Sequence, residues 1–560
     1  MAYKIGVSRA QINIFPISLD EGIAPDNVVR VIDTFVDWLD LEELGFQHST
    51  DNLRGTSMYP PSMLLKLYLY GYLNRIRSSR RLETECYRNI ELHWLLHQMT
   101  PGYHTISDFR KDNPEAIKGT FKRFTQFCIM TGLIEGETVA FDGTKIRAQN
   151  NAKNNFNAAR LEKLLDRIDI KTQEYEQYLK DLDESDTQEA ECSIPRIVMG
   201  KTKEDIEKAL TTLKERDTKY KDYQAQLQGL ADDGCTTEQL QISTIDPDAR
   251  AMPFKKSHTE VGYNIQTAGD AKQKLIVHFE VTNVGDQNAL ATLSADTKEI
   301  LNLGADKTLN ALADAGYHTG EQLALCTANG VITFVAPIDG SKTQLKSDAQ
   351  TFSKDQFIYD APTDTYTCPH QQKLTTNSTW YEHKAKRKGQ TNRKYKQYTL
   401  NVNICQKCPF AQQCHNNQTK RAHGRCIERF EHEDAVEANR KRVEQNRGAY
   451  KQRKEIIEHP FGTVKRSWGC YYTLLKTKKK VTTEFALIFL CYNIRRVANI
   501  LGNLELKKAL ICRILSIMTY LKALAAVFFD NTKKQIPICC IPKGLLVLLR
   551  GIIDLKMAPV

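Results

Sequence analysis

The strand-like run Glu137-Thr-Val-Ala-Phe141 leads directly into Asp142-Gly143-Thr144. A second apolar run, Leu309 to Ala313, is followed in the same way by Asp314. Each run is typical of a short strand, so each acid is expected at the C-terminal tip of its strand. On open α/β sheets, catalytic groups lie at such tips, held by a rigid sheet beside a cleft. Asp-Gly is also a common turn dipeptide, so neither acid is distinctive by itself.

The sequence around these two acids predicts a mixed sheet with helices between its later strands. A turn is expected at Gly269-Asp270, between two runs of β-type composition. The further strands are expected at 262–267, 274–282 and 330–337, and the helices at 288–303 and 320–329. The fold class is therefore α/β.

The rest of the chain divides by composition into segments that we expect to form separate units. We expect an N-terminal helical region at 1–135, an α/β domain that carries the two acids at 136–338 and 430–500, a helical hairpin inserted at 150–240, a basic, Cys-rich insert at 339–429, and an apolar helical tail at 501–560.

The net charge indicates a polyanionic partner. Lys and Arg number 78 against 67 Asp and Glu, a formal net charge of +11, and the basic residues are clustered. No secretory signal is recognised at the N-terminus, so the cytoplasm is the expected compartment. The apolar stretch 510–529 is interrupted by Arg513 and Lys522, which favours a packed amphipathic helix over a membrane span. No membrane partner is expected.

Two basic segments are candidate DNA contacts. Arginines interleaved in helices suit phosphate binding, although an ordinary solvated helix face is the alternative for each one. A solvated charged loop is likewise the alternative for the run 384–396. The candidates are Arg75, Arg77, Arg80 and Arg81 in the first segment and Lys386, Arg387 and Lys388 in the second.

A third acid, Glu458, lies among basic and aromatic residues. If its segment is helical, Lys465 lies two turns further on at nearly the same azimuth. Tyr450 and Arg453 precede it on the same segment. Pro460 should break or kink a helix at this point.

These segments together resemble the DDE transposases of bacterial insertion sequences. The matching pieces are Val139-Ala-Phe-Asp142-Gly-Thr-Lys145, Ala313-Asp314-Ala-Gly-Tyr317-His-Thr-Gly320 and the Tyr450/Arg453/Glu458/Lys465 signature. The resemblance implies an RNase H-like mixed sheet flanked by helices, and it covers the chain from about residue 58 to residue 499. In the family signature three residues separate the Arg from the Glu, whereas four do so here. The six-residue gap to Lys465 is kept, which favours Glu458, and Glu455 is the alternative.

The resemblance also implies a chemistry. Two Mg²⁺ (or Mn²⁺) ions would stabilise the attacking and leaving oxygens of an in-line phosphodiester displacement. Asp142 would bridge both ions, Asp314 would hold one and Glu458 the other. Arg453, Lys465 and Tyr450 would contact DNA phosphates near the scissile bond. The expected partners are the terminal inverted repeats and target DNA, bound by a homodimer in association with the bacterial nucleoid.

The cysteines predict a second, metal-binding site. Cys405-x-x-Cys408 can hold one side of a tetrahedral Zn²⁺, and Cys368 and Cys414 can complete it. Reduced, unliganded thiols are the alternative. Rival ligands are Cys426, His370 and His415.

Two other functions remain open at this stage. One is a catalytically inactive DNA-binding descendant, although all three acids are present. The other is a metal-dependent nuclease that hydrolyses DNA without strand transfer. No phosphate-binding loop of the Gly-rich type and no Gly-x-Ser-x-Gly elbow occurs in the sequence, which disfavours a nucleotide-driven motor and a serine hydrolase.

Overall fold

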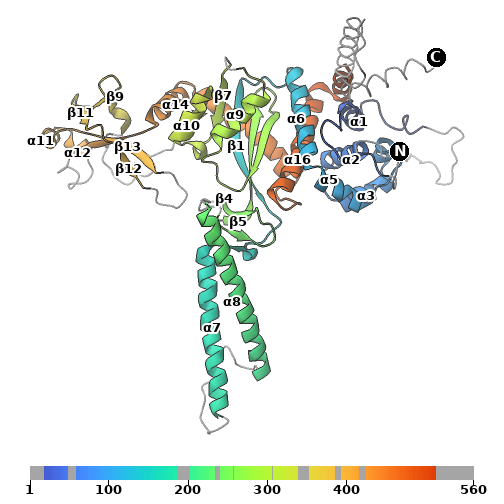
Figure 1. Cartoon of the computed structure of the whole chain (residues 1–560). Coiled ribbons are helices and arrows are strands. Elements are labelled where there is room, and N and C mark those ends of the chain that lie inside the picture. Colours follow the sequence, from blue (N-terminus) through green and yellow to red (C-terminus); the bar gives the residue numbers. More distant parts are fainter. Residues whose placement is uncertain are drawn as a thin grey trace, which may run out of the picture.

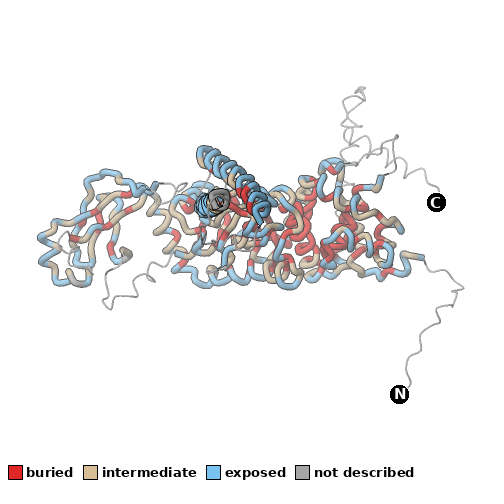
Figure 2. The backbone as a smooth tube through the Cα atoms, turned by 90° about the horizontal axis from the view of Figure 1, so that it is seen from below, coloured by how far each residue is buried: buried red, intermediate tan, exposed pale blue. Residues whose placement is uncertain are grey.

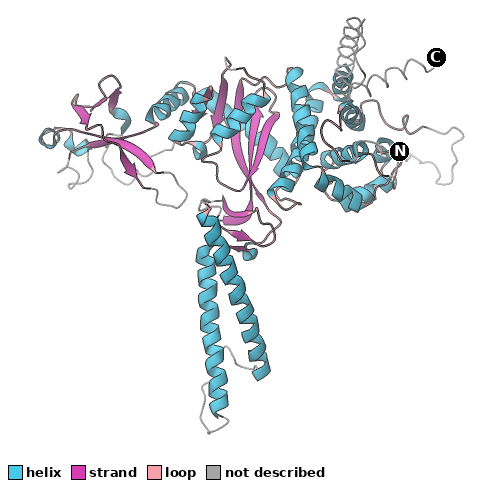
Figure 3. Cartoon of the chain, in the orientation of Figure 1, coloured by secondary structure: helices cyan, strands magenta, loops and turns pink. Residues whose placement is uncertain are grey.

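The structure, a computed structural model, is mixed α/β, with helices gathered at one end and a separate group of strands at the other (Figures 1 and 3). It describes residues 18–47, 58–185, 202–233, 240–255, 258–304, 307–337, 352, 354–384, 392–414 and 424–512.

A six-stranded sheet occupies the centre of the molecule. Its order is β4-β5-β1-β7-β8, and β6 also pairs with β5. β1 is antiparallel to β5 and parallel to β7, and β7 is parallel to β8. The strands are β1 (Thr138–Arg147), β4 (Arg250–Lys255), β5 (His258–Asp270), β6 (Ile276–Thr282), β7 (Leu309–Ala313) and β8 (Val331–Val335).

The expectation that the first strand ends at Asp142 is wrong. β1 continues for five residues beyond Asp142, because β5 pairs with it as far as Arg147 opposite Gly262. Asp142 and Gly143 are therefore in paired strand rather than in a turn. The prediction for Asp314 is confirmed, since β7 ends at Ala313.

One face of the sheet is covered by the helix α15 (Arg447–Phe461). Side chains alternate between faces along a strand, so Ala140 and Asp142 point to the same side of β1. Ala140 and Leu312 form a small buried cluster with Ile456 and Ile457 of α15. α15 is thus packed on the face to which Asp142 belongs.

The helix α9 (Leu290–Ile300) packs against β5 and β6, and the helices α6 (Pro114–Met130) and α16 (Lys478–Leu501) pack on the β6 side of the sheet. The ring of Phe279 makes edge-to-face contacts with Phe121 of α6 and Phe489 of α16, at centroid distances of 5.2 and 5.1 Å. Asn493 of α16 pairs with both backbone groups of Ile276, at 2.9 and 2.8 Å. Both the oxygen and the nitrogen of the buried Asn493 side-chain amide therefore have a hydrogen-bond partner.

The N-terminal helices pack against this same side through α6 and α16. The helix α2 is buried along almost its whole length, because its apolar residues surround the axis rather than one face. The helices are α1 (Val28–Trp38), α2 (Pro61–Leu73), α3 (Ser79–Arg88), α4 (Ile90–Leu95) and α5 (Tyr103–Asp112), followed by α6.

Two long helices, α7 (Ala158–Ser185) and α8 (Lys203–Asp232), lie side by side and project away from the sheet (Figure 1). Most of their surface is exposed (Figure 2). A narrow seam between them buries residues from both helices. The buried members of this seam are Ile168, Tyr175, Ile206, Leu210 and Leu213.

A second sheet lies at the far end from the N-terminal helices (Figure 1). Its order is β12-β13-β11-β10-β9, and β14 pairs with β13. We call the described residues between 352 and 430 the Cys module. Its elements are β9 (Ile358–Asp360), β10 (Thr365–Thr367), β11 (Lys373–Thr376), β12 (Tyr381–His383), β13 (Arg393–Thr399), α11 (Val402–Gln406), α12 (Ala411–Cys414) and β14 (Cys426–Phe430). It is followed by α14 (Glu433–Gln445) and α15.

No single helix in the described ranges is long and apolar enough to cross a membrane. α16 and the next helix, Asn503–Cys512, meet that test only as a pair bent by 106°. The apolar stretch at 510–529 continues beyond residue 512, outside the described residues.

Arg77 ties the N-terminal helices to α16. Its Nη2 donates to the carbonyl of Tyr472 at 3.0 Å and lies 3.8 Å from a carboxylate oxygen of Glu484, which is fully buried. The backbone N–H groups of Leu474 and Leu475 also donate to Glu484. The guanidinium of Arg77 is therefore engaged inside the protein.

We expect Arg77→Ala to lower the free energy of unfolding by about 3–5 kcal/mol, because it leaves the Glu484 carboxylate buried without its cation. Urea unfolding followed by circular dichroism measures the change. Arg81→Ala, at an exposed position four residues on, is the matched control and should stay within about 0.5 kcal/mol. Equal unfolding midpoints for Arg77→Ala and the wild type would contradict this role.

Candidate active site

Asp142 lies in the middle of β1, where it meets a cation from α15. Its Oδ2 is 3.4 Å from Nη1 of Arg453, and its Oδ1 accepts a hydrogen bond from the Gly143 N–H at 2.9 Å. Burial raises the pKa of Asp142 to about 7. Arg453 acts against this rise, whereas the carboxylates of Asp314 and Asp286 add to it. Three acidic side chains are therefore close enough to influence one another.

Asp314 begins the short 3₁₀ helix Ala315–Tyr317 directly after β7. Its side chain caps this turn by accepting from the Gly316 N–H at 2.9 Å. The buried Tyr317 donates its hydroxyl hydrogen bond to Oε1 of Gln266 on β5. The loop that carries Asp314 is thus anchored to the central sheet.

Asp286 is a third acid that sequence reasoning missed. Its Oδ1 accepts hydrogen bonds from Nδ2 of Asn264 at 2.8 Å and from Nε2 of Gln266 at 2.6 Å. A Cβ atom on Gly143 would lie only 2.2 Å from this Oδ1, so a side chain at Gly143 would collide with Asp286. Asp286 comes four residues after the end of β6. The sequence signal for Asp286 was an acid shortly after a strand. This signal is weaker than that of Asp314, because no strand leads directly into Asp286.

The space above Gly143 is bordered by Oδ1 of Asp286, Oδ1 of Asn264 and Nε2 of Gln266. The Oδ1 of Asn264, a fully buried residue, has no hydrogen-bond partner in the described part of the chain and would lie 2.8 Å from a Cβ on Gly143. Carboxylate oxygens are ligands that Mg²⁺ and Mn²⁺ prefer, so Asp142 and Asp314 fit such an ion in chemical type. Within the described residues, no three His, Cys, Asp or Glu side chains stand together as a formed metal site.

α15 carries the family-signature residues over the sheet. Arg453 is 9% exposed and reaches Asp142, while Tyr450 lies about one turn earlier and is partly exposed. Lys465 donates to the backbone carbonyl of Lys145 on β1 at 2.9 Å. Burial lowers the pKa of Lys465 to about 8, with the Asp142 carboxylate acting in the opposite direction. Both cations are therefore electrostatically coupled to Asp142.

The two candidate glutamates are three residues apart and are neighbours on the exposed side of α15. Glu455 forms an ion pair with Lys274 at 2.6 Å, next to the turn between β5 and β6. Glu458 directly follows Ile457, which is packed on the sheet, and within the described residues the structure does not bring Glu458 into a cluster with Asp142 and Asp314. Glu455 is therefore engaged by Lys274.

The helix continues through Pro460, so the expectation of a break at that residue is wrong. The distortion appears immediately afterwards, where residues Gly462–Ser467 form a π-helical stretch. A proline removes one backbone donor and crowds the preceding turn, which a locally wider helix can accommodate. This stretch carries Lys465 to β1.

The candidate DNA-contacting arginines differ in their accessibility. Arg75 is exposed and its Nη2 donates to Oγ of Ser467, beside the π-helical stretch. Arg80 is exposed and stacks on Tyr103, with 5.1 Å between the guanidinium carbon and the ring centroid. Arg81 is exposed, whereas Arg77 is 8% exposed. Lys386, Arg387 and Lys388 lie outside the described residues.

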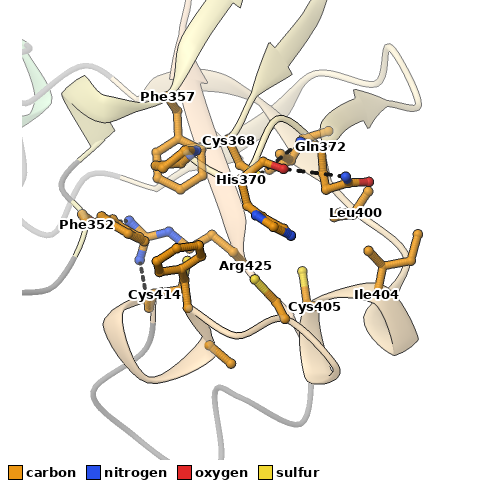
Figure 4. A pocket seen from close by; sticks show the side chains of 15 residues that line it. Phe352, Phe357, Cys368, His370, Gln372, Leu400, Ile404, Cys405, Cys414 and Arg425 are labelled. Carbon is orange, nitrogen blue, oxygen red and sulfur yellow. Dashed lines mark hydrogen bonds between the residues drawn. The ribbon is translucent and has the colours of Figure 1, made fainter.

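The four cysteines of the predicted zinc site line one pocket of the Cys module (Figure 4). These are Cys368, Cys405, Cys408 and Cys414, and His370 lines the same pocket. Cys426 is exposed on β14 and is not among the lining residues. His415 lies outside the described residues.

Two family models match the sequence. "Transposase domain (DUF772)" matches residues 17–112 and "Transposase DDE domain" matches residues 367–498. The second range includes α15 and Glu458 but not Asp142 or Asp314. Together the matches support a DDE-type insertion-sequence transposase as the class of this protein.

A search of curated proteins gave no match. Among solved structures, the chain is similar to a cryo-EM structure of the piggyBac transposase synaptic complex with hairpin DNA. The two are 9% identical, the alignment covers 95% of this chain and 84% of that chain, and the TM-score is 0.28.

The raised pKa of Asp142 makes stability depend on pH. Its folded value, about 7, is above the usual 3.8, so the folded protein binds the proton more tightly than the unfolded chain. The contribution of Asp142 to the free energy of unfolding is fully present below about pH 4 and is lost as the pH rises to about 7. We expect the unfolding free energy of the wild type to fall, relative to that of Asp142→Asn, by on the order of 2 kcal/mol between pH 5 and pH 8. Urea titrations of both proteins measure this difference, and parallel pH profiles would contradict it.

Proposed function

We propose that this protein binds the terminal inverted repeats of an insertion sequence and performs metal-dependent phosphodiester cleavage and strand transfer. The observation that carries the proposal is that Asp142 and Asp314 belong to two adjacent parallel strands, close enough for the Asp314 carboxylate to raise the pKa of Asp142, while Arg453 of α15 lies 3.4 Å from Asp142. Two acids held by a sheet, next to a helix that carries basic residues, are suited to bind a phosphodiester substrate.

An RNase H-like catalytic core is part of the proposal. Its support is the strand pattern, in which three antiparallel strands (β6, β5 and β1) are continued by two parallel ones (β7 and β8). The first acid is on the central strand β1 and the second follows the neighbouring β7. The proposed catalytic domain comprises 136–338 and 430–500, with the helical hairpin (150–240) and the Cys-rich segment (339–429) as inserts.

Asp142, Asp314 and Glu458 are the proposed ligands of two Mg²⁺ or Mn²⁺ ions. When bound, such ions stabilise the charge on the attacking and leaving oxygens of the phosphodiester. We propose Asp142 as the shared ligand, because its strand β1 lies between β5 and β7 and α15 brings Arg453 to it. The neighbouring Asp286 holds Asn264 and Gln266 in place and adds negative charge that favours a cation. Ligand binding requires the ionised form of Asp142, so occupancy should increase as pH rises towards 7 and above.

Arg453 and Lys465 are the proposed phosphate contacts at the site, with Tyr450 as a hydrogen-bond donor. Arg453 offers a planar guanidinium suited to two phosphate oxygens, and Lys465 a point charge. Both already lie beside Asp142, where a scissile phosphate would also be held. Their positive charge offsets repulsion between the acids and the DNA backbone.

The proposed DNA-contacting surface also includes exposed basic residues away from the acids. Arg75, Arg80 and Arg81 of the N-terminal region are accessible, and Lys386, Arg387 and Lys388 remain candidates from the sequence. Arg77 is left out of this set because it is buried against Tyr472 and Glu484. We further propose a homodimer on DNA in the bacterial cytoplasm, by analogy with the family.

The choice between the two glutamates is directly testable. We expect Glu458→Gln to reduce Mg²⁺-dependent cleavage of end DNA more than about 100-fold, since even residues that only support a metal ligand cost 10–100-fold when changed. In Glu455→Gln, which changes the other exposed glutamate of α15, cleavage should stay within about threefold of the wild-type rate. A gel assay with labelled end DNA measures both. Loss of cleavage in Glu455→Gln but not in Glu458→Gln would reverse the assignment.

A second experiment separates a transposase from its two alternatives. We supply an end DNA already cleaved to expose its 3′-hydroxyl, together with a target plasmid and Mg²⁺. A transposase should join the two molecules, since the hydroxyl replaces water as the nucleophile, and Asp142→Asn should not. Cleavage without joining would indicate a nuclease. Binding of ends without either reaction would indicate an inactive descendant.

A further inference from the structure

The Cys module has a very small hydrophobic core. Five buried apolar side chains make up this core, and all of them come from the strands or from the segment just before β9. They are Phe357, Tyr366, Leu374, Tyr398 and Ile427. Modules of this size gain little stability from burial alone and are commonly fixed by a metal or by disulfides.

The two short helices α11 and α12 are the least supported part of the module. α11 has no buried residue, and the apolar side chains Ile404 and Phe410 are 44% and 38% exposed. The backbone of Gln413 accepts from the Phe352 N–H at 2.7 Å, and Arg425 donates to the carbonyl of Cys414 at 3.2 Å. Both of these contacts hold α12, and neither of them involves α11.

Four thiols converge exactly where those helices meet the sheet. Cys405, Cys408 and Cys414 come from α11, α12 and the turn between them, and Cys368 comes from the turn between β10 and β11. All four line one cavity of about 40 Å³ (Figure 4).

The Cys368 turn is arranged to present its sulfur as an acceptor. The N–H of Gln372 donates to Sγ of Cys368 at 3.3 Å, and the Cys368 N–H donates to the carbonyl of Gln372 at 2.9 Å. An outer hydrogen bond of this kind orients a side chain that binds a metal. On the other side, the Cys408 N–H donates to the carbonyl of Cys405, a turn that brings both side chains of the Cys-x-x-Cys pair to the cavity.

From this convergence we propose that Cys368, Cys405, Cys408 and Cys414 hold one structural Zn²⁺ that fastens α11 and α12 to the β10–β11 turn. Four thiolates form the tetrahedral, sulfur-rich site that Zn²⁺ prefers, with Zn–S bonds of about 2.3 Å. The four thiols line one cavity without standing at ligand spacing, so the proposed site requires them to lie closer together when the metal is bound.

Of the two rival ligands among the described residues, Cys426 lies outside the cavity and His370 lines it. Cys426 lies on β14 opposite Thr399, exposed and outside the cavity. His370 lines the cavity, but its ring packs against Phe410 with centroids 5.5 Å apart. We therefore assign His370 to packing and the four thiols to the metal.

The zinc content of the full-length protein, purified under reducing conditions without chelator, tests the proposal. Atomic absorption should find about one equivalent in the wild type, and less than about a tenth of that in the variant carrying both Cys405→Ser and Cys408→Ser. Cys426→Ser and His370→Ala are the matched controls and should each retain the full equivalent. Circular dichroism checks that every variant is folded.

A second measurement on the wild type does not depend on any variant folding. Replacement of the metal by Co²⁺ should give intense thiolate-to-metal charge-transfer absorption and the visible bands of tetrahedral Co²⁺. Folded wild type without zinc and without these bands would overturn the proposal. Zinc retained by the double Ser variant, or lost from either control, would overturn the ligand set. Neither measurement involves DNA, so its failure leaves the proposed transposase activity untouched.

Discussion

The packing of Ile456 and Ile457 on Ala140 and Leu312 is the contact on which the arrangement of the site depends. Ala140 and Leu312 each lie two residues before a site aspartate, so the same side of the sheet carries an apolar patch and, beside it, the acids. Because the helix is fixed on that patch, Arg453 is held against Asp142. Burial of two isoleucine side chains is worth about 3–6 kcal/mol, more than a partly exposed ion pair could supply. Apolar packing therefore positions the charges, and not the reverse.

The electrostatics of the site follow from its position at the edge of that packed layer. Asp142 is removed from water by α15 and faces two further carboxylates, so its proton is held until about pH 7. Arg453 and Lys465 offset this only in part. A group of acids that resists ionisation when alone gains most from a bound cation, which relieves their repulsion. The same features that destabilise the charged site therefore favour its occupation by a metal ion and a phosphate.

Sequence patterns predicted the parts of the fold that depend on local composition. β7 was located at its observed bounds, because a short apolar run ended at a single acid. β1 was predicted too short, since a paired partner strand can keep an Asp-Gly dipeptide extended. Asp286 was missed because its role depends on contacts with Asn264 and Gln266 of another strand. The burial of Arg77 and the separation of Cys426 from the other thiols are likewise set by tertiary contacts that no local pattern encodes.

The central claim is that three acids distant in sequence share divalent cations. Anomalous diffraction from crystals grown with Mn²⁺ and cleaved end DNA tests it most directly. The account predicts two Mn²⁺ peaks, with carboxylate oxygens of Asp142, Asp314 and Glu458 within about 2.0–2.3 Å of at least one of them and Asp142 bound to both. Mn²⁺ peaks to which Glu458 is not bound, or that lie away from Asp142 and Asp314, would contradict it.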